Sequence, residues 1–382
     1  MKKICIVTAA SLTLRAFMRN HLLRLSAKYD VSAVADFTSE DLSGDWLPGV
    51  RLAAVPIARQ ISPAADLRAL IALYRHFRSG RFDVVHSVTP KAGLLAMGAA
   101  RLAGVPHRIH CFTGQVWATR RGLARTMLKG ADRLIAANAN HVLTDSHSQR
   151  DFLEDEGIIR KGHADVLGQG SISGVDLERF HPDDATRARI RHGLGIPDQA
   201  CLLLFVGRLN RDKGVLDLAR AFAQLARNNG TAWLAMVGPD EAGVGVQFEE
   251  LCGEAINHVR RIDYTPAPEH YMAAADVFVL PSYREGFGSV VIEAAACGLP
   301  AVASQIYGLA DAVEDGSTGL LHPPGDVEAM HDHLQHLCAD ETRRRLLGEK
   351  ARERAISNFS MESVTADLLD YYDTILGPQI PS

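Results

Sequence analysis

Two glutamates lie eight residues apart around a glycine-spaced turn in the segment REGFGSVVIEAAACGLP, residues 284–300. An apolar run upstream ends at Pro281 and predicts a short buried strand, and a helix is expected to begin near Ser289. The first turn of such a helix has unpaired backbone N–H groups at the positive end of the helix dipole. Gly286 and Gly288 would let a ligand approach this backbone closely. The segment therefore predicts an anion-binding site, and a phosphorylated sugar would suit it.

The two glutamates of this segment could bind hydroxyl groups. Glu285 would lie in the loop before the helix, where its carboxylate can accept hydrogen bonds from a sugar. Glu293 follows Ser289 by four residues, so it would project along the same helix face and could accept bonds from a vicinal diol such as ribose. Either glutamate alone is more simply explained as a solvated loop residue or an incidental polar residue on a core helix. The combined pattern favours the binding function.

A second candidate phosphate site lies in LLLFVGRLNRDKGVLDLARAF, residues 202–222. The apolar run at its start predicts a strand, Gly207 ends that strand, and the apolar spacing after Gly214 predicts a helix. Arg208 and Lys213 lie between these two elements. Open parallel sheets bind their ligands at loops of this kind, so both cations are candidate binding residues.

Both cations of this loop suit a phosphate group. Arg208 can donate two parallel hydrogen bonds to phosphate oxygens, and Lys213 can act as a point charge. The alternative is that each is an ordinary surface charge, with Lys213 paired to Asp212 or Asp217. The spacing alone leaves both interpretations open.

The segment GRLNRDKG at 207–214, followed by the E-x7-E pattern at 285–293, resembles the retaining nucleotide-sugar glycosyltransferases of family 4, the glycosyl transferases group 1. Residues 85–118 are similar to members that assemble bacterial surface polysaccharides on lipid carriers. The segment SGVDLERFHP at 173–182 extends the similarity over most of the chain. The resemblance implies an α/β protein of GT-B architecture, with two Rossmann-like domains facing each other across a cleft.

The resemblance also implies roles for individual residues. In such enzymes the residues that match Arg208 and Lys213 hold the donor diphosphate. The match to Glu293 binds the nucleotide ribose, and the match to Glu285 contacts the transferred sugar. Arg208, Lys213 and Glu285 are therefore the expected catalytic residues. The donor-binding set also includes Gly207, Ile262, Gly286, Phe287, Gly288 and Ser289.

One departure from the family pattern concerns the first domain. Many members carry a histidine in a T-x-H-G loop, where this chain has Thr113 followed by Gly114. His110 could replace that histidine if the loop is arranged differently, although a histidine in a strand is more often a structural residue. The first loop also lacks the Gly-Gly pair common in the family, but Ser11 is small enough to admit a ligand. These four residues are the candidates for the acceptor site and reaction centre.

The expected organisation is an acceptor-binding domain at 1–170, a hinge at 171–184 and a donor-binding domain at 185–360. Strand and helix patterns alternate in both halves, which favours mostly parallel sheets. By resemblance, the amphipathic helix within 361–382 would cross back to the first domain. The expected strands are KKICIVTA, YDVSAVAD, VRLAAVPI, FDVVHSV, HRIHCF, DRLIAA and HVLTDS in the first half and CLLLFVG, AWLAMVG, HVRRIDY, DVFVLPS and LPAVAS in the second, with GLLHPPGD as a terminal loop.

Composition limits the classes of protein. The chain has 382 residues and is 47% hydrophobic, so it can form two domains with their own cores. No apolar run reaches the roughly 18 residues of a membrane span, and the beginning of the chain does not indicate a signal peptide. The six cysteines lack metal or disulfide spacing, which favours a reducing cytoplasm. No Asp-x-Asp motif suggests a magnesium site, so neither a metal nor another cofactor is expected.

The net charge of −4 hides an asymmetry between the two halves. Residues 1–182 hold 24 Lys plus Arg against 16 Asp plus Glu, whereas residues 183–382 hold 17 against 29. In the first half, the basic residues gather in segments that are also apolar, which would suit an anionic membrane or a lipid-linked diphosphate. Solvated arginines on amphipathic helices explain the same pattern, so both interpretations stay open. No zinc-finger or RNA-binding signature supports a nucleic-acid partner.

The residues and the resemblance together predict a retaining, metal-independent hexosyltransferase. Its donor would be a nucleotide diphosphate sugar, with UDP expected because it is the commonest donor nucleotide among the similar polysaccharide-assembling enzymes. It would transfer a hexose or N-acetylhexosamine to a lipid-linked or saccharide acceptor in bacterial surface polysaccharide biosynthesis, in the cytoplasm or at the inner face of the cytoplasmic membrane. The alternatives are a UDP-N-acetylhexosamine epimerase of the same fold and a non-catalytic nucleotide-sugar-binding protein.

Overall fold

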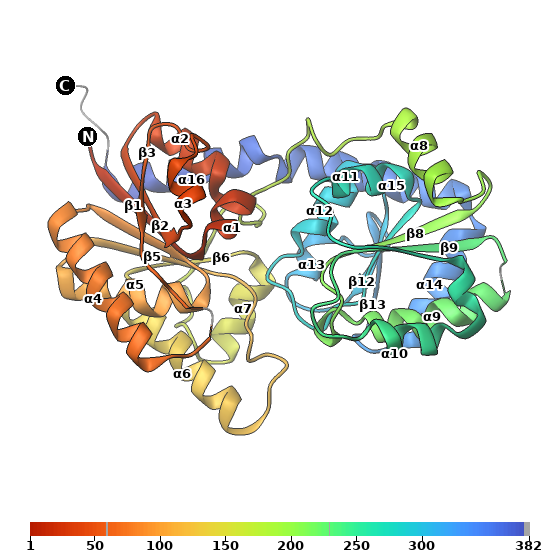
Figure 1. The fold of residues 1–382 in the computed structure, drawn as a ribbon, viewed down its shortest axis with the longest axis horizontal. Helices are drawn as coiled ribbons and strands as arrows, with labels where there is room; N and C mark the ends of the chain where they lie inside the picture. The colour runs from red at the N-terminus through yellow and green to blue at the C-terminus, as the bar shows by residue number, and fades with distance from the viewer. Residues whose placement is uncertain (59, 229, 378–382) are drawn as a thin grey trace. The chain divides into compact units, whose positions relative to one another are not determined.

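The computed structural model describes residues 1–58, 60–228 and 230–377. These residues form two compact units, each built on a parallel sheet with helices on both faces (Figure 1). The first unit contains Met1–Ser173 and the chain from Met361 onward, and the second contains Gly174–Ser360. Both units are Rossmann-like α/β domains, as the alternation of strand and helix patterns predicted.

The first unit is built on seven parallel strands. They are β1 (Lys3–Ala10), β2 (Asp30–Asp36), β3 (Val50–Ala54), β4 (Val84–Val88), β5 (His107–Phe112), β6 (His141–Thr144) and β7 (Asp165–Val166), and they are arranged in the order β3-β2-β1-β4-β5-β6-β7. The helices are α1 (Ser11–Thr13), the π-helix η1 (Leu14–Met18), α2 (Arg19–Ser26), α3 (Ser39–Ser43), α4 (Pro63–Gly80), α5 (Pro90–Ala103), α6 (Gly122–Asn138), α7 (His147–Asp155) and α16 (Met361–Leu376).

Side chains of the inner strand β1 alternate between two hydrophobic cores. Cys5 and Val7 pack in the core beneath α4, α5 and α6, whereas Ile4 and Ile6 pack in the core beneath α2 and α16. The last helix is fixed to this unit by polar contacts as well. Tyr372 of α16 bonds through its hydroxyl to His86 Nδ1 at 2.9 Å. The C-terminal helix therefore completes the first unit, although it follows the second unit in the sequence.

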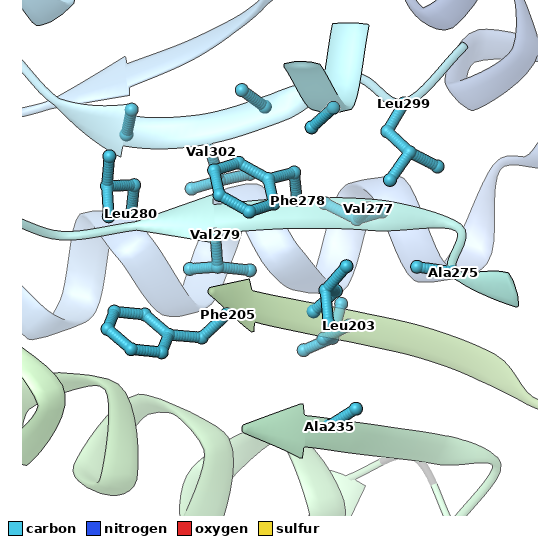
Figure 2. Packing of buried hydrophobic residues seen from close by; sticks show 14 of the residues in the cluster. Leu203, Phe205, Ala235, Ala275, Val277, Phe278, Val279, Leu280, Leu299 and Val302 are labelled. Atoms are coloured by element: carbon cyan, nitrogen blue, oxygen red, sulfur yellow. The ribbon is translucent and has the colours of Figure 1, made fainter. Parts of the chain in front are cut away.

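The second unit has six parallel strands. They are β8 (Cys201–Val206), β9 (Ala232–Val237), β10 (Val259–Ile262), β11 (Val277–Leu280), β12 (Ala301–Ser304) and β13 (Gly319–His322), in the order β10-β9-β8-β11-β12-β13. The helices are α8 (Asp184–Leu194), the 3-10 helix η2 (Arg211–Lys213), α9 (Val215–Asn228), α10 (Gly245–Cys252), the 3-10 helix η3 (Gly253–His258), α11 (Pro268–Ala274), α12 (Ser289–Ala296), α13 (Leu309–Ala312), α14 (Val327–Ala339) and α15 (Glu341–Phe359). Figure 2 shows the buried side chains of Leu203 and Phe205 on β8 and of Val277 and Phe278 on β11.

Strand order reverses once in each sheet. In the second unit, the chain moves outward from β8 to β10 on one side and from β11 to β13 on the other. In the first unit, the corresponding reversal lies between β1 and β4. Ligands of open α/β sheets bind outside the carboxyl ends of the strands at such a reversal, because the loops on its two sides turn away from each other.

Three segments differ from the sequence-based expectation, the first being Asp165–Val166, which was not among the expected strands and forms β7 beside β6. Residues 132–137, expected as a strand, lie in the second half of α6, because Asp132 and Ile135 recur at helical spacing on its buried face. Asp132 accepts a hydrogen bond from Trp117 Nε1 at 2.7 Å there. Residues 319–322, expected within a terminal loop, form the edge strand β13 beside β12. None of the helices in the described ranges has the length and hydropathy that a membrane crossing requires.

Candidate active site

The loop that follows β8 carries Arg208 and Lys213. Its path depends on Gly214, where an added Cβ would lie 1.9 Å from the carbonyl oxygen of Pro281. Gly214 also has a φ of 67°, a conformation that favours glycine. The Asn210 side chain accepts a hydrogen bond from the Lys213 N–H at 3.0 Å and caps the short helix η2. These contacts fix the point at which the Lys213 side chain leaves the backbone.

The loops after β8 and β11 are joined by several contacts. Tyr283 donates its backbone N–H to the Asp212 carbonyl oxygen at 2.8 Å, and Arg284 pairs with the Asp212 carboxylate at 3.2 Å. The Tyr283 hydroxyl donates to the Asp217 carboxylate at 2.6 Å. Burial, followed by this acidic partner, raises the pKa of Tyr283 to about 12. The two loops on either side of the strand reversal therefore form one connected structure.

Lys213 and Glu285 meet where these loops join. Lys213 Nζ lies 2.5 Å from Glu285 Oε1, and the two side chains are only 20% and 13% exposed. Ser282 also donates its hydroxyl to Glu285 Oε1 at 2.7 Å. Lys213 thus pairs with Glu285, which is 72 residues away, rather than with Asp212 or Asp217. The structure brings together two residues that were proposed from separate sequence motifs.

Arg208 has a more open environment than Lys213. Its guanidinium lies 3.0 Å from the Glu241 carboxylate, and the two side chains are 44% and 47% exposed. Ion pairs exposed to this degree contribute little to the free energy of folding. A phosphate could therefore replace Glu241 as the partner of the guanidinium at a small cost in free energy. Gly207 directly follows β8 and packs closely against Gly238. A Cβ added to Gly238 would lie 2.0 Å from the Gly207 carbonyl oxygen.

Helix α12 begins where the sequence predicted, at Ser289. Gly288 precedes it with a φ of 81°, and an added Cβ there would lie 2.4 Å from Leu309 Cδ2. Phe287 is buried and its ring lies 5.2 Å from that of Phe359, so its side chain belongs to the core. The half-buried Gly286 and Ser289 flank this anchor. No side chain caps the start of α12, and the Val291 N–H already donates to the Gly288 carbonyl oxygen at 2.8 Å, so the Ser289 and Val290 N–H groups are the candidates for binding an anion.

Glu293 interacts with a basic residue that the sequence analysis did not select. It is half-buried within α12, and burial, reinforced by Glu269 and opposed by Arg179, raises the pKa of Glu293 to about 7. Arg179 pairs with Glu269 at 2.7 Å and donates to the Pro266 carbonyl oxygen at 2.6 Å. Arg179 lies in the segment 173–182, which the sequence analysis noted for its family resemblance. Nothing in the sequence indicated that Arg179 would lie near Glu269 and Glu293.

Ile262 ends β10 at the same edge of the second sheet. Its carbonyl oxygen accepts the Gly238 N–H at 2.9 Å, which joins the ends of β9 and β10. Tyr264, two residues later, is 74% exposed. The loop after β10 therefore offers both a fixed backbone and an exposed aromatic ring.

The candidates of the first unit lie at the ends of β1 and β5. Ser11 is the first residue of α1, is half-buried and hydrogen-bonds to Asp41. Thr113 and Gly114 follow β5 and are also half-buried, and the Thr113 carbonyl oxygen accepts from Gln149 Nε2 at 2.8 Å. Thr113 and Gly114 therefore lie in a braced loop at the carboxyl edge of the first sheet.

His110 is held inside the first unit. It is 1% exposed, and its Nδ1 is 2.8 Å from the Ser87 hydroxyl. An added Cβ on Gly93 would lie 2.3 Å from its ring, so α5 packs directly on it. Burial, followed by the neighbouring His86, lowers the pKa of His110 to about 3. A buried neutral ring favours the structural alternative for this residue.

Thr89 was not selected from the sequence. It lies between β4 and α5, at the strand reversal of the first sheet, and has a φ of 79°, which is unusual for a residue with a side chain. Its Oγ1 is buried and has no hydrogen-bond partner among the described residues. Strained backbone of this kind is often found at binding sites. No signal in the sequence indicated this conformation, because threonine seldom adopts it.

The arrangement in the second unit can bind a phosphorylated ligand. It offers two cations, a glycine-lined helix start, and two carboxylates that can accept hydroxyl hydrogen bonds. The part of the chain that the structure describes contains no group of three or more His, Cys, Asp or Glu side chains placed to hold a metal ion.

Two family models match the chain. Residues 186–354 match the glycosyl transferases group 1, and residues 18–170 match the glycosyl transferase 4-like domain. The first match falls within the second unit, and the second match falls within the first unit. Each unit is therefore matched by a model of its own.

Curated relatives match over most of the chain. The capsular polysaccharide biosynthesis glycosyltransferase CapM of Staphylococcus aureus is 28% identical over 84% of this chain and 84% of its own. The D-inositol 3-phosphate glycosyltransferase of Frankia alni is 32% identical over 78% of this chain and 76% of its own. The UDP-Gal:alpha-D-GlcNAc-diphosphoundecaprenol alpha-1,3-galactosyltransferase of Escherichia coli is 28% identical over 85% of this chain and 84% of its own.

Solved structures share the fold. A sucrose-phosphate synthase of Thermosynechococcus elongatus has a TM-score of 0.84 at 21% identity and covers 98% of this chain and 99% of its own. Anabaena HepE, in complex with UDP and glucose, has a TM-score of 0.81 at 18% identity and covers 98% of this chain and 100% of its own. With matches to both units and to relatives above 30% identity, the chain belongs to the group 1 glycosyltransferases of GT-B fold.

Proposed function

We propose that the protein is a retaining, metal-independent hexosyltransferase that transfers a hexose or N-acetylhexosamine from a UDP-sugar to a lipid-linked acceptor in bacterial surface polysaccharide biosynthesis. The observation that supports this most is the pairing of Lys213 with Glu285 across the two loops at the strand reversal. Arg208 and the start of α12 lie on the same two loops. These groups match what a sugar diphosphate offers, namely negative phosphates and hydroxyl groups.

The donor diphosphate would be bound by positive charge that the protein itself supplies. As the bond to the sugar breaks, negative charge grows on the leaving phosphate, and Lys213, Arg208 and the N–H groups of α12 would stabilise it. The phosphate would replace Glu285 as the partner of Lys213. The freed carboxylate could then accept hydrogen bonds from the transferred sugar. This set of groups gives a physical reason to expect transfer without a metal.

A nucleotide that contains ribose suits Glu293 and the loop after Ile262. Glu293 could accept both hydroxyls of the ribose, and Arg179 beside it would keep part of that carboxylate population charged. UDP is the proposed nucleotide because HepE binds UDP and the Escherichia coli relative uses UDP-Gal. The loop after Ile262 would meet the base, where the exposed Tyr264 ring could stack on it.

Retention of configuration is proposed without a protein nucleophile. The Glu285 carboxylate is held by Lys213 and Ser282, which suits a binding group better than an attacking one. As the family resemblance suggests, an oxygen of the departing diphosphate would take the proton of the acceptor hydroxyl on the same face of the sugar. The acceptor oxygen then bonds to the anomeric carbon as the bond to the phosphate breaks.

The acceptor is proposed to be lipid-linked and to be met at an anionic membrane. Helix α6 presents an apolar stripe to solvent, with Leu123, Met127 and Leu134 exposed by 75%, 64% and 57%. Asp132, the acidic residue of this helix, is buried and bonded to Trp117. Its carboxylate is therefore not exposed on the apolar stripe, where it would repel lipid phosphates. Exposed basic residues, including Arg121, flank the stripe. An exposed surface of this kind suits the interfacial region of an anionic bilayer.

A single assay tests the reaction. The protein is incubated in excess EDTA with a panel of UDP-sugars and undecaprenyl-diphosphate-linked acceptors, and products are identified by mass and by the anomeric configuration. We expect an acceptor that gains one sugar in the same configuration as the donor. An altered UDP-sugar formed without acceptor would favour the epimerase, and binding without any turnover would favour the non-catalytic alternative.

Vesicle flotation tests the membrane contact separately. Wild-type protein should float with anionic vesicles and remain behind with neutral ones. Replacing Leu123 and Met127 by glutamate should abolish flotation while soluble acceptor analogues are still used. Equal recovery with both kinds of vesicle would exclude an electrostatic membrane contact.

A further inference from the structure

Two cysteines of the second unit lie in direct contact. Cys338, near the end of α14, donates its S–H to Cys201, the first residue of β8, with the sulfur atoms 2.9 Å apart. Cys201 is 5% exposed, whereas Cys338 is half-buried and so reaches the surface. A disulfide bond is about 2.05 Å long, so closing this gap requires less than about 1 Å of movement.

We propose that Cys201 and Cys338 form a redox-sensitive dithiol, a modification site that a low-molecular-weight disulfide can oxidise. Free buried cysteines often act only as small apolar groups, which is the competing explanation. The contact distance separates the two explanations, because apolar packing does not require the sulfur atoms to approach each other this closely. The half-buried position of Cys338 gives an oxidant a route to the pair.

The reaction balances with glutathione disulfide as the oxidant. The Cys338 thiolate attacks one sulfur of the oxidant, forms a mixed disulfide and releases one glutathione thiolate. The Cys201 thiolate then attacks Cys338 Sγ, which forms the internal disulfide and releases the second glutathione. The protein loses two protons and two electrons, and the oxidant is reduced to two thiols.

A cation lies close to the dithiol. Arg344 donates from Nη1 to the carbonyl oxygens of Leu337 and Cys338, at 2.6 and 3.4 Å. Its positive charge acts to lower the pKa of the Cys201 thiol, but the hydrogen bond from Cys338, burial and the charge of Asp276 have larger effects and raise that pKa overall. Basic neighbours of this kind are typical of reactive cysteines. The remaining cysteines, Cys5, Cys111, Cys252 and Cys297, are all buried.

The cross-link would affect stability more than donor binding. It would join residues separated by 137 positions, and closing a loop of this size restricts the unfolded chain strongly. Cys201 starts the six-residue strand β8, whereas the loop with Arg208 and Lys213 follows its other end. Oxidation is therefore expected to stabilise the second unit and leave its phosphate-binding loops unchanged.

The experiment treats the full chain with glutathione disulfide and follows intact mass, peptide maps and the urea midpoint. We expect a mass lower by two hydrogen atoms, a peptide linking Cys201 to Cys338, a higher midpoint, and full reversal by dithiothreitol. Cys338→Ser should lose every response, whereas the control Cys252→Ser should keep them.

Two results would overturn the dithiol. One is that all six thiols stay reduced, and the other is that Cys338 carries glutathione without forming the internal bond. Peptide mapping of the wild-type chain decides the matter even if Cys338→Ser folds poorly. Binding of UDP, measured on the reduced and oxidised forms, reports on the proposed function independently of this chemistry.

Discussion

The strand order reverses once in each sheet, and the two reversals hold different kinds of residue. In the second unit, the loops carry paired charges, with Lys213 against Glu285 and Arg208 against Glu241. In the first unit, the backbone at the reversal includes the strained Thr89, and Ser87 of β4 bonds to the buried neutral His110 of the neighbouring strand β5. The same topology thus supports two chemical environments. The second unit places a half-buried ion pair between its two loops, whereas the first places a strained residue and a neutral hydrogen bond beside its reversal.

The largest expected effect comes from removing Lys213, the half-buried cation at the reversal of the second unit. Lys213→Ala should lower turnover by about a hundred- to a thousand-fold, as removal of other charge-stabilising donors does. The measurement is release of nucleoside diphosphate at saturating acceptor, with circular dichroism to verify the fold. Lys350→Ala, which removes an exposed lysine of α15, is the matched control and should retain wild-type turnover. Near wild-type turnover in Lys213→Ala would remove the proposed role of this residue.

A smaller loss is expected from neutralising the partner of that cation. Glu285→Gln keeps the size of the side chain but cannot match the charge of Lys213, and it weakens hydrogen bonds to sugar hydroxyls. We expect transfer to fall by roughly ten- to a hundred-fold, the value of a hydrogen bond to a charged group. UDP binding, measured by calorimetry, should be retained or tighter because Lys213 loses its internal partner. Weaker UDP binding would contradict the exchange of partners.

Glu293 is expected to make donor binding depend on pH. Since burial raises its pKa to about 7, the carboxylate is charged above that pH and protonated below it. The affinity for the donor should therefore fall as the pH decreases from 8 to 6, and Glu293→Gln should flatten the profile. Folding stability should change in the opposite sense, because a raised carboxyl pKa favours the folded state at low pH and this contribution is lost between the usual pKa of 4.5 and about 7. An unchanged profile in the variant would assign the pH dependence to another group.

The smallest effect on transfer is expected at the buried His110 of β5, which bonds to Ser87 beside the reversal of the first unit. His110→Gln should leave kcat and its pH profile unchanged, because the ring is buried and neutral throughout the working range. It should lower the unfolding midpoint instead, since the Ser87 hydroxyl loses its partner at a cost of about 1–3 kcal/mol. A loss of turnover without a loss of stability in His110→Gln would contradict the structural role of this histidine.

Local patterns in the sequence were enough to predict most of the alternating elements and to select the two candidate phosphate-binding segments. The strand before Gly207 and the helix from Ser289 follow from runs of apolar residues and glycine positions, which act over a few residues. Residues 132–137 were misassigned because a short apolar run reads equally well as a strand or as a turn of buried helix. In the structure these residues are helical, and Trp117, which lies in the turn before α6, donates a hydrogen bond to Asp132. The sequence pattern of the segment does not reveal this contact.

The partners of the site residues could not be predicted in the same way. The pairing of Lys213 with Glu285 depends on β8 and β11 being neighbours, which sequence spacing does not reveal. Arg179 comes near Glu293 only through the folding of the segment that leads into the second unit. The positive φ of Thr89 could not be predicted from the sequence either. It results from the surrounding structure, which overrides the backbone preference of threonine.

The contact between Lys213 and Glu285 gives the lysine a counter-ion that belongs to the protein itself. Under the proposed function, a complete donor satisfies both members, because its phosphate meets the ammonium and its sugar meets the carboxylate. The spent nucleotide satisfies only the ammonium, so Glu285 competes with it for Lys213. Under that proposal, Glu285 would promote departure of the spent nucleotide and so limit inhibition by this by-product.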